Sequence, residues 1–486
     1  MTLGCVGHSF LYEMECTLRI FRPGCKIRVI AASPEGEGDW ALTALKGDTA
    51  RAEVRLDGAR LSRERALPPG SGEQEKERVL AQLLFSALSE LTGIRPPWGI
   101  LTGVRPVRLV RRWAGEGLDE GDIRRRFEQD YLVQPEKAVL TVETGRAQKH
   151  VLDKNRPGTY SLYVSIPFCP SRCLYCSFVS HAIENARRLV PDYVERLCEE
   201  IDHTAEVAKG LGLTLLSVYV GGGTPTVLEA GQLDRILGAV NRCFDRERLL
   251  EYTVEAGRPD TITREKLLVL KDRGVDRISI NPQTMEDGVL EAIGRKHTAR
   301  QAEESFWLAR ELGFNNINMD LIAGLPSDTE AGFMHTVRRV MDLGPENITV
   351  HTLTVKTSST LRERENAFAP SALDWEEILA RSRRELRQGD YTPYYLYRQK
   401  GTVQNLENLG YARPGKEGVY NIYSMEDVHT VLAVGAGGVT KLCSGGDPFQ
   451  RLYNFKYPYE YLDRFGEVLE RKSAINTWRE QLWSCQ

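Results

Sequence analysis

Residues 163–176 read Tyr-Val-Ser-Ile-Pro-Phe-Cys-Pro-Ser-Arg-Cys-Leu-Tyr-Cys, an apolar run that leads directly into three closely spaced cysteines. Cys169, Cys173 and Cys176 form a C-x3-C-x2-C motif, and three thiolates on one short loop can bind a single inorganic centre. Structural zinc normally takes four protein ligands, and this loop holds no fourth cysteine or histidine. A [4Fe–4S] cluster bound by three cysteines leaves one iron open to a small molecule. The motif therefore favours such a cluster, with a zinc site completed by a distant residue as the alternative.

The composition around this motif is that of an ordinary globular protein. The chain has 486 residues, of which 41% are hydrophobic and 27% charged, which suggests two or three domains. The 64 Lys and Arg residues against 67 Asp and Glu residues argue against a dedicated nucleic-acid binder. No apolar run approaches the roughly 18 residues of a membrane span, and the first residues do not resemble a secretion signal. We therefore expect a cytoplasmic protein whose other cysteines are free thiols.

From about residue 160 onward, short apolar strands alternate with amphipathic helices. The predicted strands are Leu162–Phe168, Leu215–Val220, Glu251–Ala256, Arg277–Asn281, Asn316–Ile322 and Asn347–Leu353. Such alternation predicts an α/β fold in which right-handed crossovers build a parallel sheet. Six units are too few for a closed eight-stranded barrel, so we expect a partial (β/α)6 barrel.

Two flanking regions have a different pattern. Residues 1–155 are predicted to form an N-terminal α+β domain, with strands at Lys26–Ala32, Trp40–Leu45 and Ala52–Leu56 and a helix over Glu73–Leu91. The barrel core is expected to occupy residues 156–365. Residues 366–486 are predicted to form a C-terminal region that caps the substrate side. After residue 400 this region reads mostly as loops, with a last helix near Pro458–Glu470.

Polar residues stand where the predicted strands end. They are Gly221–Thr224, Glu255, Asn281, Gln283, Asn318, Asp320, Thr352 and Thr354. The carboxyl ends of parallel strands meet at one edge of a sheet, so these side chains are expected to line one cavity. The glycine run would let the backbone approach a ligand closely.

Several longer strings identify a family resemblance. They are Tyr163–Cys176, Tyr219–Thr226, Arg277–Gln283, Ile293–His297 and Asn318–Pro326. Together they resemble the radical S-adenosylmethionine (SAM) superfamily and, within it, the oxygen-independent coproporphyrinogen III dehydrogenase group. The resemblance covers about residues 160–440. The N-terminal extension, with Leu-Thr-Gly-Val-Arg-Pro at residues 101–106, is similar to a longer branch of that group.

The resemblance implies an activity. In such enzymes Cys169, Cys173 and Cys176 would hold a [4Fe–4S] cluster, and SAM would chelate its open iron. A reducing electron donor such as flavodoxin or ferredoxin would drive the cleavage of SAM to a 5′-deoxyadenosyl radical. This radical would remove hydrogen from a propionate of coproporphyrinogen III. Loss of CO2 and one electron would leave a vinyl group, and two such turnovers would yield protoporphyrinogen IX.

The resemblance also implies which residues bind one or two SAM molecules. Tyr163, Gly222 and Glu255 would contact the first SAM, and Val439 would lie near its adenine. The positions that match contacts to a second SAM are Tyr175, Gly223, Thr224, Gln283, Arg295, Asp320 and Thr354. In this set Asp320 would hold ribose hydroxyls, and Arg295 would pair with a carboxylate.

Two departures from the family pattern keep other functions open. The dehydrogenases carry a fourth cysteine two residues after the third, where this chain has Phe178. The related heme chaperones carry a His-Asn-x-x-Tyr-Trp string, where residues 407–412 read Glu-Asn-Leu-Gly-Tyr-Ala. Because the histidine and tryptophan are absent, heme handling loses its main support. A heme-binding relative and a radical SAM methyltransferase are the alternatives to the dehydrogenase.

Overall fold

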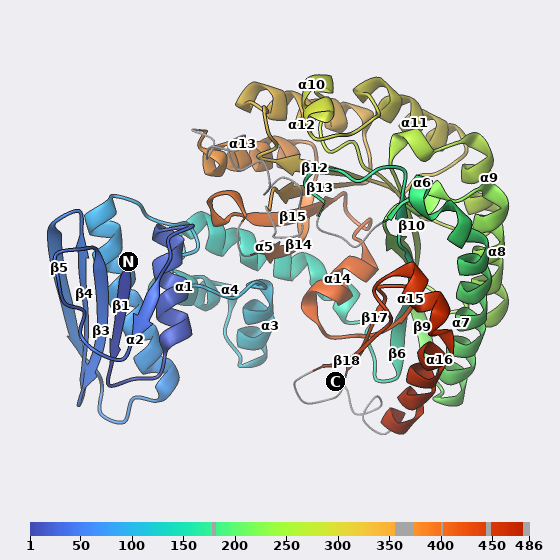
Figure 1. The fold of residues 1–486 in the computed structure, drawn as a ribbon. Coiled ribbons are helices and arrows are strands. Elements are labelled where there is room, and N and C mark those ends of the chain that lie inside the picture. Colours follow the sequence, from blue (N-terminus) through green and yellow to red (C-terminus); the bar gives the residue numbers. More distant parts are fainter. Residues whose placement is uncertain (177–180, 355–372, 400–401, 444–448, 480–486) are drawn as a thin grey trace. The chain divides into compact units, whose positions relative to one another are not determined.

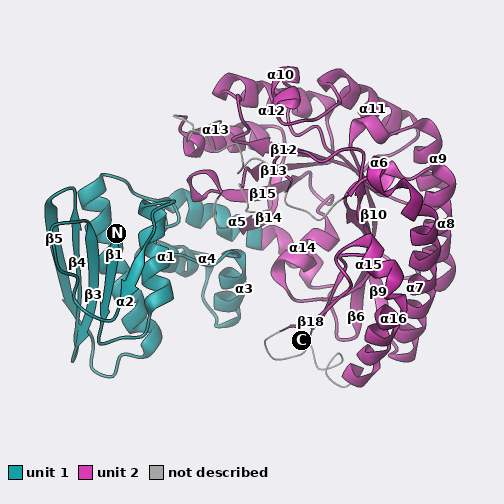
Figure 2. Ribbon diagram, viewed as in Figure 1, with its two compact units in different colours: residues 1–145 teal, residues 146–486 magenta. Residues whose placement is uncertain are grey.

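The computed structural model describes residues 1–176, 181–354, 373–399, 402–443 and 449–479. The chain divides into two compact units, Met1–Gly145 and Arg146–Gln486 (Figure 2). The further division of the second unit at residues 365/366 stays a prediction. In the part of the chain that is described, no helix is both long and apolar enough to cross a membrane.

The first unit is built on a five-stranded sheet in the order β2-β1-β3-β4-β5. The strands are β1 (Thr2–Val6), β2 (Arg28–Ile30), β3 (Trp40–Lys46), β4 (Thr49–Leu56) and β5 (Ala59–Ala66). Helices α1 (Leu11–Phe21) and α2 (Glu73–Thr92) pack apolar side chains, such as Leu18 and Leu84, against this sheet. Helices α3 (Val107–Gly115), α4 (Glu120–Asp130) and α5 (Pro135–Leu152) follow.

The α+β prediction for this region is confirmed, but six of its elements were not predicted. They are β1, α1, β5, α3, α4 and α5. Strand β5 is an edge strand with seven of its eight residues exposed, and Arg60, Arg63, Glu64 and Arg65 give it the polarity of a loop. Edge strands commonly carry such charges because these oppose pairing with other chains.

Six parallel strands form the centre of the second unit, as predicted. They are β6 (Thr159–Ile166), β9 (Thr214–Gly222), β10 (Glu251–Gly257), β11 (Arg277–Ile280), β12 (Ile317–Ala323) and β13 (Asn347–Thr352), and they lie in this order in the sheet. Their side chains, among them Leu162, Val218 and Met319, are buried. The partial (β/α)6 barrel is therefore confirmed.

Helices cover the outer side of these strands (Figure 1). They are α7 (Val190–Gly210), α8 (Ala230–Cys243), α9 (Arg264–Asp272), α11 (Ala299–Glu311) and α12 (Glu330–Leu343), with the short α10 (Asp287–Ala292) before α11. The side chain of Thr298 caps the N-terminus of α11, where it accepts a hydrogen bond from the backbone of Gln301.

The prediction of loops after residue 400 was wrong, because this region extends the sheet at both edges to eleven strands. At one edge β15 (Glu407–Ala412) pairs antiparallel with β13, and β14 (Thr392–Arg398) pairs with β15. At the other edge β16 (Thr430–Val434) pairs parallel with β6, followed by the antiparallel β17 (Val439–Leu442) and β18 (Gln450–Tyr453). The polar residues of β15 concealed it: Glu407 is buried against Arg383 at 3.0 Å, and the Asn408 side chain accepts from the backbone of Thr352.

Helices α13 (Trp375–Gln388) and α14 (Val419–Glu426) precede a C-terminal pair, α15 (Pro458–Asp463) and α16 (Phe465–Ser473), which replaces the single predicted helix. Glu200 of α7 is fully buried and holds this C-terminal segment. It accepts hydrogen bonds from the backbone of Gly435 at 2.7 Å, from Asn454 at 2.7 Å and from the Tyr461 hydroxyl at 2.8 Å. The Lys472 ammonium lies 3.4 Å from the same carboxylate. One buried acid therefore joins β16, β18, α15 and α16 to the barrel.

Most described cysteines outside the motif form no disulfide, as expected, namely Cys5, Cys16, Cys25, Cys198 and Cys243. Cys443 departs from this expectation because it is disulfide-bonded. Cys485 lies outside the described residues.

Candidate active site

A cavity of about 460 Å³ opens at the carboxyl ends of the parallel strands. Its lining includes thirteen of the fourteen predicted site residues: Tyr163, Cys169, Cys173, Tyr175, Cys176, Gly222, Gly223, Thr224, Glu255, Gln283, Arg295, Asp320 and Thr354. The remaining residue, Val439, begins β17 and is not among the residues that line the cavity. The prediction that polar residues at the ends of the strands line one cavity therefore agrees with the structure. Phe178, the departure at the fourth cysteine position, lies outside the described residues.

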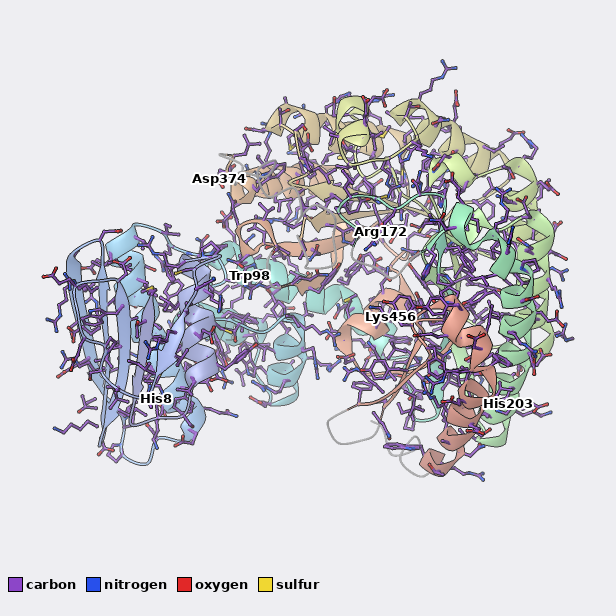
Figure 3. The ribbon with its side chains drawn as sticks, in the orientation of Figure 1. His8, Trp98, Arg172, His203, Asp374 and Lys456 are labelled. Atoms are coloured by element: carbon purple, nitrogen blue, oxygen red, sulfur yellow. The ribbon has the colours of Figure 1, made fainter. Side chains whose placement is uncertain are left out.

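The cysteine loop leaves the sheet at the end of β6, where Phe168–Cys169 (β7) pairs with His181–Ala182 (β8). Arg172, labelled in Figure 3, marks the position of this loop. The Thr224 hydroxyl donates to the Cys169 sulfur at 3.6 Å. Among the described residues, no three His, Cys, Asp or Glu side chains form a ready metal-binding group, so the thiols line the cavity without closing around a centre.

Glycine is required where the loop and the glycine run meet. A Cβ atom on Gly223 would lie 2.4 Å from the carbonyl oxygen of Phe168 and 3.0 Å from the Cys169 sulfur. Gly222 has a φ of +114°, which side chains disfavour. The two glycines therefore bring the backbone of β9 against the first cysteine.

Arg295 fixes the last part of the cysteine loop. Its guanidinium donates to the Tyr175 hydroxyl at 2.9 Å and 3.3 Å, and to the backbone carbonyl of Asn281 at 3.3 Å. Burial opposes the charge of Arg295, but the neighbouring Tyr175 and Cys173 raise its pKa above the ordinary value. Arg295 is therefore a permanent cation at the cavity wall.

Glu255 lies among three tyrosines. The Tyr219 hydroxyl donates to its Oε1 at 2.6 Å, and the rings of Tyr163, Tyr219 and Tyr420 stack with centroids 4.4–6.1 Å apart. Burial raises the pKa of Glu255 to about 7, although the bond from Tyr219 lowers it. The carboxyl group is thus poised to ionise when a cationic ligand arrives.

Asp320 stands in a different polar network. The Asn318 amide donates to Asp320 at 2.7 Å, and the His351 ring nitrogen lies 3.8 Å from its other oxygen. Burial would raise the pKa of Asp320, but its hydrogen bonds and the charge of His351 hold it below the ordinary value. The Tyr397 hydroxyl lies 3.3 Å from the second ring nitrogen of His351. Asp320 is therefore an ionised acceptor with a fixed orientation.

In the described part of the chain, Gln283 places an unpartnered polar atom in the wall of the cavity. Its side chain is only 6% exposed, and its Oε1 atom has no hydrogen-bond partner among the described residues. Its backbone has a φ of +70° and pairs with β12, which directs the residue into the cavity wall. A buried amide oxygen without a partner costs free energy, so a donor on a bound molecule is expected there.

The sequence analysis did not single out several polar residues of this cavity, among them Tyr219, His351, Tyr397 and Tyr420. Tyr219 lies opposite Tyr163 in the β6–β9 register, so strand pairing could have indicated it. His351 lies two residues after Thr349 on β13, so the two side chains share one face of the strand, and this period of two could have indicated His351. Tyr397 and Tyr420 come from β14 and α14, which the sequence analysis did not predict.

The side chains present fit an iron–sulfur cluster with SAM. The cavity combines three thiols, an ionisable carboxyl group, a fixed carboxylate, a guanidinium and an amide oxygen without a partner. These groups suit, in turn, iron, an ammonium, ribose hydroxyls, a carboxylate and a further donor.

Comparisons with known proteins agree with this chemistry. The family model of the radical SAM superfamily matches residues 163–340. The oxygen-independent coproporphyrinogen-III oxidase-like protein HemZ of Bacillus subtilis (strain 168) is 36% identical over 433 residues, which cover 87% of this chain and 86% of that protein. The heme chaperone HemW of the same strain is 39% identical over 197 residues, 40% of this chain and 51% of HemW.

A solved structure supports the fold. The radical SAM coproporphyrinogen III oxidase HemN from Escherichia coli superposes with a TM-score of 0.52 at 24% identity, covering 67% of this chain and 73% of HemN. This chain belongs to the radical SAM superfamily, in the family of oxygen-independent coproporphyrinogen III oxidase-like proteins. The cofactors of that superfamily are a [4Fe–4S] cluster and SAM.

Proposed function

We propose that this chain is an oxygen-independent coproporphyrinogen III dehydrogenase that converts two propionates to vinyl groups and yields protoporphyrinogen IX. The observation that carries the proposal is the single cavity shared by the cysteine loop and the predicted SAM-binding residues. The names of the relatives HemZ and HemN point to the same substrate class. A small reducing protein such as flavodoxin or ferredoxin is the proposed electron donor.

The residues near the cysteines orient SAM in this proposal. Glu255, with Tyr219 as its hydrogen-bond donor, holds the ammonium group, and Asp320 accepts from ribose hydroxyls. Arg295 presents its guanidinium to a carboxylate. When bound, the cluster and SAM supply a 5′-deoxyadenosyl radical that takes hydrogen from the substrate. The stacked tyrosines around Glu255 give this part of the cavity aromatic walls.

The substrate is assigned to the wall formed by β13, β15 and β14. This wall contributes His351, Asn408, Tyr395 and Tyr397, and Met425 of α14 lies beside it. The aromatic rings offer flat apolar surface for pyrrole rings, and the polar atoms offer hydrogen bonds to carboxylates. This mixture suits a macrocycle with acidic side chains better than a wholly polar ligand.

Residues 407–412 argue against a heme chaperone. They form the buried strand β15, in which Glu407 pairs with Arg383 and is 2% exposed. A residue committed to a buried ion pair is not available as a heme ligand. Glu407, which stands at the histidine position of the chaperone string, therefore has a structural role here.

The proposal is tested with reconstituted protein under nitrogen, supplied with reductant, SAM and coproporphyrinogen III. We expect two CO2 and two 5′-deoxyadenosine for each protoporphyrinogen IX, one of each for every propionate that becomes a vinyl group. Tight heme uptake without substrate-dependent SAM cleavage would assign a heme-binding function instead. S-adenosylhomocysteine with a methylated product would assign a methyltransferase. Either result overturns the proposal.

A matched pair of variants tests the site. Arg295→Ala is expected to retain cluster iron but to lose at least about tenfold in turnover, because a charge-assisted contact to ligand is removed. Arg300→Ala is the control, since Arg300 lies exposed on α11 and pairs only with Glu304 at 2.8 Å in the described structure. Equal turnover in the two variants would contradict a contact between Arg295 and the bound ligand.

A further inference from the structure

Arg258, to which no cofactor contact has been assigned, holds the segment between the first two cysteines of the loop. Ser171 lies midway between Cys169 and Cys173, next to Arg172 (Figure 3). The Arg258 guanidinium donates to the Ser171 hydroxyl at 2.7 Å and to its backbone carbonyl at 3.3 Å. One arginine therefore grips both the side chain and the backbone of the loop.

Arg258 is itself held rigidly. It follows β10 directly and is only 3% exposed. Its Nε and Nη2 atoms donate to the two carboxylate oxygens of Asp260 at 2.9 Å and 2.7 Å. Burial alone would raise the pKa of Asp260, but the bonds and charge of Arg258 keep it below the ordinary value. This two-point pairing leaves the third guanidinium nitrogen aimed at Ser171.

We propose that Arg258 is a positioning residue for the iron–sulfur centre: it fixes the Cys169–Cys173 half of the loop and places a positive charge beside the centre. Arg295 performs the corresponding task for the Cys173–Cys176 half through Tyr175. Each gap of the C-x3-C-x2-C motif thus has its own guanidinium. The inference concerns the loop and holds for any substrate.

Two consequences separate this role from general structural support. Loss of the clamp frees the loop in the protein without its cluster, because a buried hydrogen bond from a charged group is removed. Loss of the charge makes addition of an electron to the cluster less favourable. The reduced cluster is more negative, and the negative charge of Asp260 is no longer balanced by Arg258.

The first test measures amide hydrogen exchange of residues 168–176 in the apo protein with its thiols reduced. Arg258→Gln is expected to speed exchange about tenfold or more, and Ser171→Ala is expected to speed it less, since the backbone contact remains. Arg264→Gln is the control: Arg264 also pairs with a carboxylate, its Nη2 donating to both oxygens of Glu311 at 2.7 Å, but it is half exposed on α9. The control is expected to leave exchange in residues 168–176 unchanged.

The second test measures the midpoint potential of the reconstituted cluster. Arg258→Gln is expected to shift the potential to more negative values, whereas Arg258→Lys, which keeps the charge, is expected to shift it less while still loosening the loop. Unchanged loop exchange in both Arg258→Gln and Ser171→Ala would overturn the clamp. Equal loosening in Arg264→Gln, or an unchanged potential in Arg258→Gln, would also overturn the proposal. If Arg258→Gln does not fold, Ser171→Ala and Arg258→Lys decide the outcome.

Discussion

The Tyr219 hydroxyl donates a 2.6 Å hydrogen bond to Oε1 of Glu255 and so links the ends of two adjacent strands, β9 and β10. Burial keeps the pKa of Glu255 at about 7, and this hydrogen bond is the largest influence that lowers it. Tyrosine and glutamate therefore act together: the first sets how readily the second becomes a carboxylate in the cavity.

Tyr219→Phe is expected to weaken SAM binding at pH 7 about tenfold, because the carboxylate of Glu255 loses a hydrogen bond worth about 1.5–3 kcal/mol. The pKa of Glu255 rises further, so the pH at which binding is half-maximal moves upward by about one pH unit. Equilibrium dialysis of SAM with the unreduced, cluster-loaded protein at several pH values measures this shift. An unchanged pH profile would contradict the assigned role of Tyr219.

Glu255→Gln is expected to stabilise the apo protein at pH 8 while abolishing tight SAM binding. The folded pKa of about 7 lies above the ordinary value of 4.5, so stability declines as pH rises between these values and the full cost is present above pH 7. That cost is at most about 3 kcal/mol. Urea denaturation at pH 4.5 and pH 8 tests the sign. The exposed Glu265, replaced by glutamine, serves as the control.

Cys173→Ala is expected to remove the iron–sulfur cluster, because two thiolates do not retain it. Iron and sulfide content and the visible absorbance of anaerobically reconstituted protein measure the loss. Cys198→Ala, which alters a free thiol on α7 that does not line the cavity, should load iron normally. A fully loaded Cys173→Ala protein, or wild-type protein that binds only zinc, would refute the cluster assignment.

Lys472→Met is expected to lower the free energy of unfolding by about 3–5 kcal/mol, because it leaves the Glu200 carboxylate buried without its cation. Lys472 is 1% exposed and Glu200 is fully buried. The double variant Glu200→Gln/Lys472→Met should recover most of that loss. Thermal denaturation of the single and double variants measures both effects, and equal destabilisation in the two would contradict the pairing.

The six central strands could be predicted because each is an apolar run with a polar terminus, as in Glu251–Ala256. Strand β15 could not, because its identity depends on distant partners, whereas β14 and β16 are apolar or aromatic runs that the sequence analysis overlooked. Glu407 and Asn408 are residue types typical of loops. In the fold, Arg383 neutralises Glu407, and the amide oxygen of Asn408 accepts a hydrogen bond from the backbone of Thr352. Buried polar strands of this kind carry no periodic apolar pattern.

Some residues of the candidate site could be predicted from the sequence for the same reason as the central strands. Glu255, Gln283 and Asp320 were accessible to prediction because they terminate strands. His351 was passed over because the reading of β13 stopped at the threonines beside it. Arg258 gave no signal of its own, since its partner Ser171 lies 87 residues earlier and only folding brings them together.

The parallel pairing of β16 with β6 imposes an order on biogenesis. Strand β6 carries the cysteine loop at its end, and one of its two hydrogen-bonding edges is satisfied only by residues 430–434. A nascent polypeptide that has emerged only as far as residue 400 thus exposes an open strand edge beside the three thiols of the cysteine loop, which invites pairing with other chains. Completion of the sheet beside the cysteine loop is in this way a late event, reserved for a polypeptide whose synthesis is nearly finished.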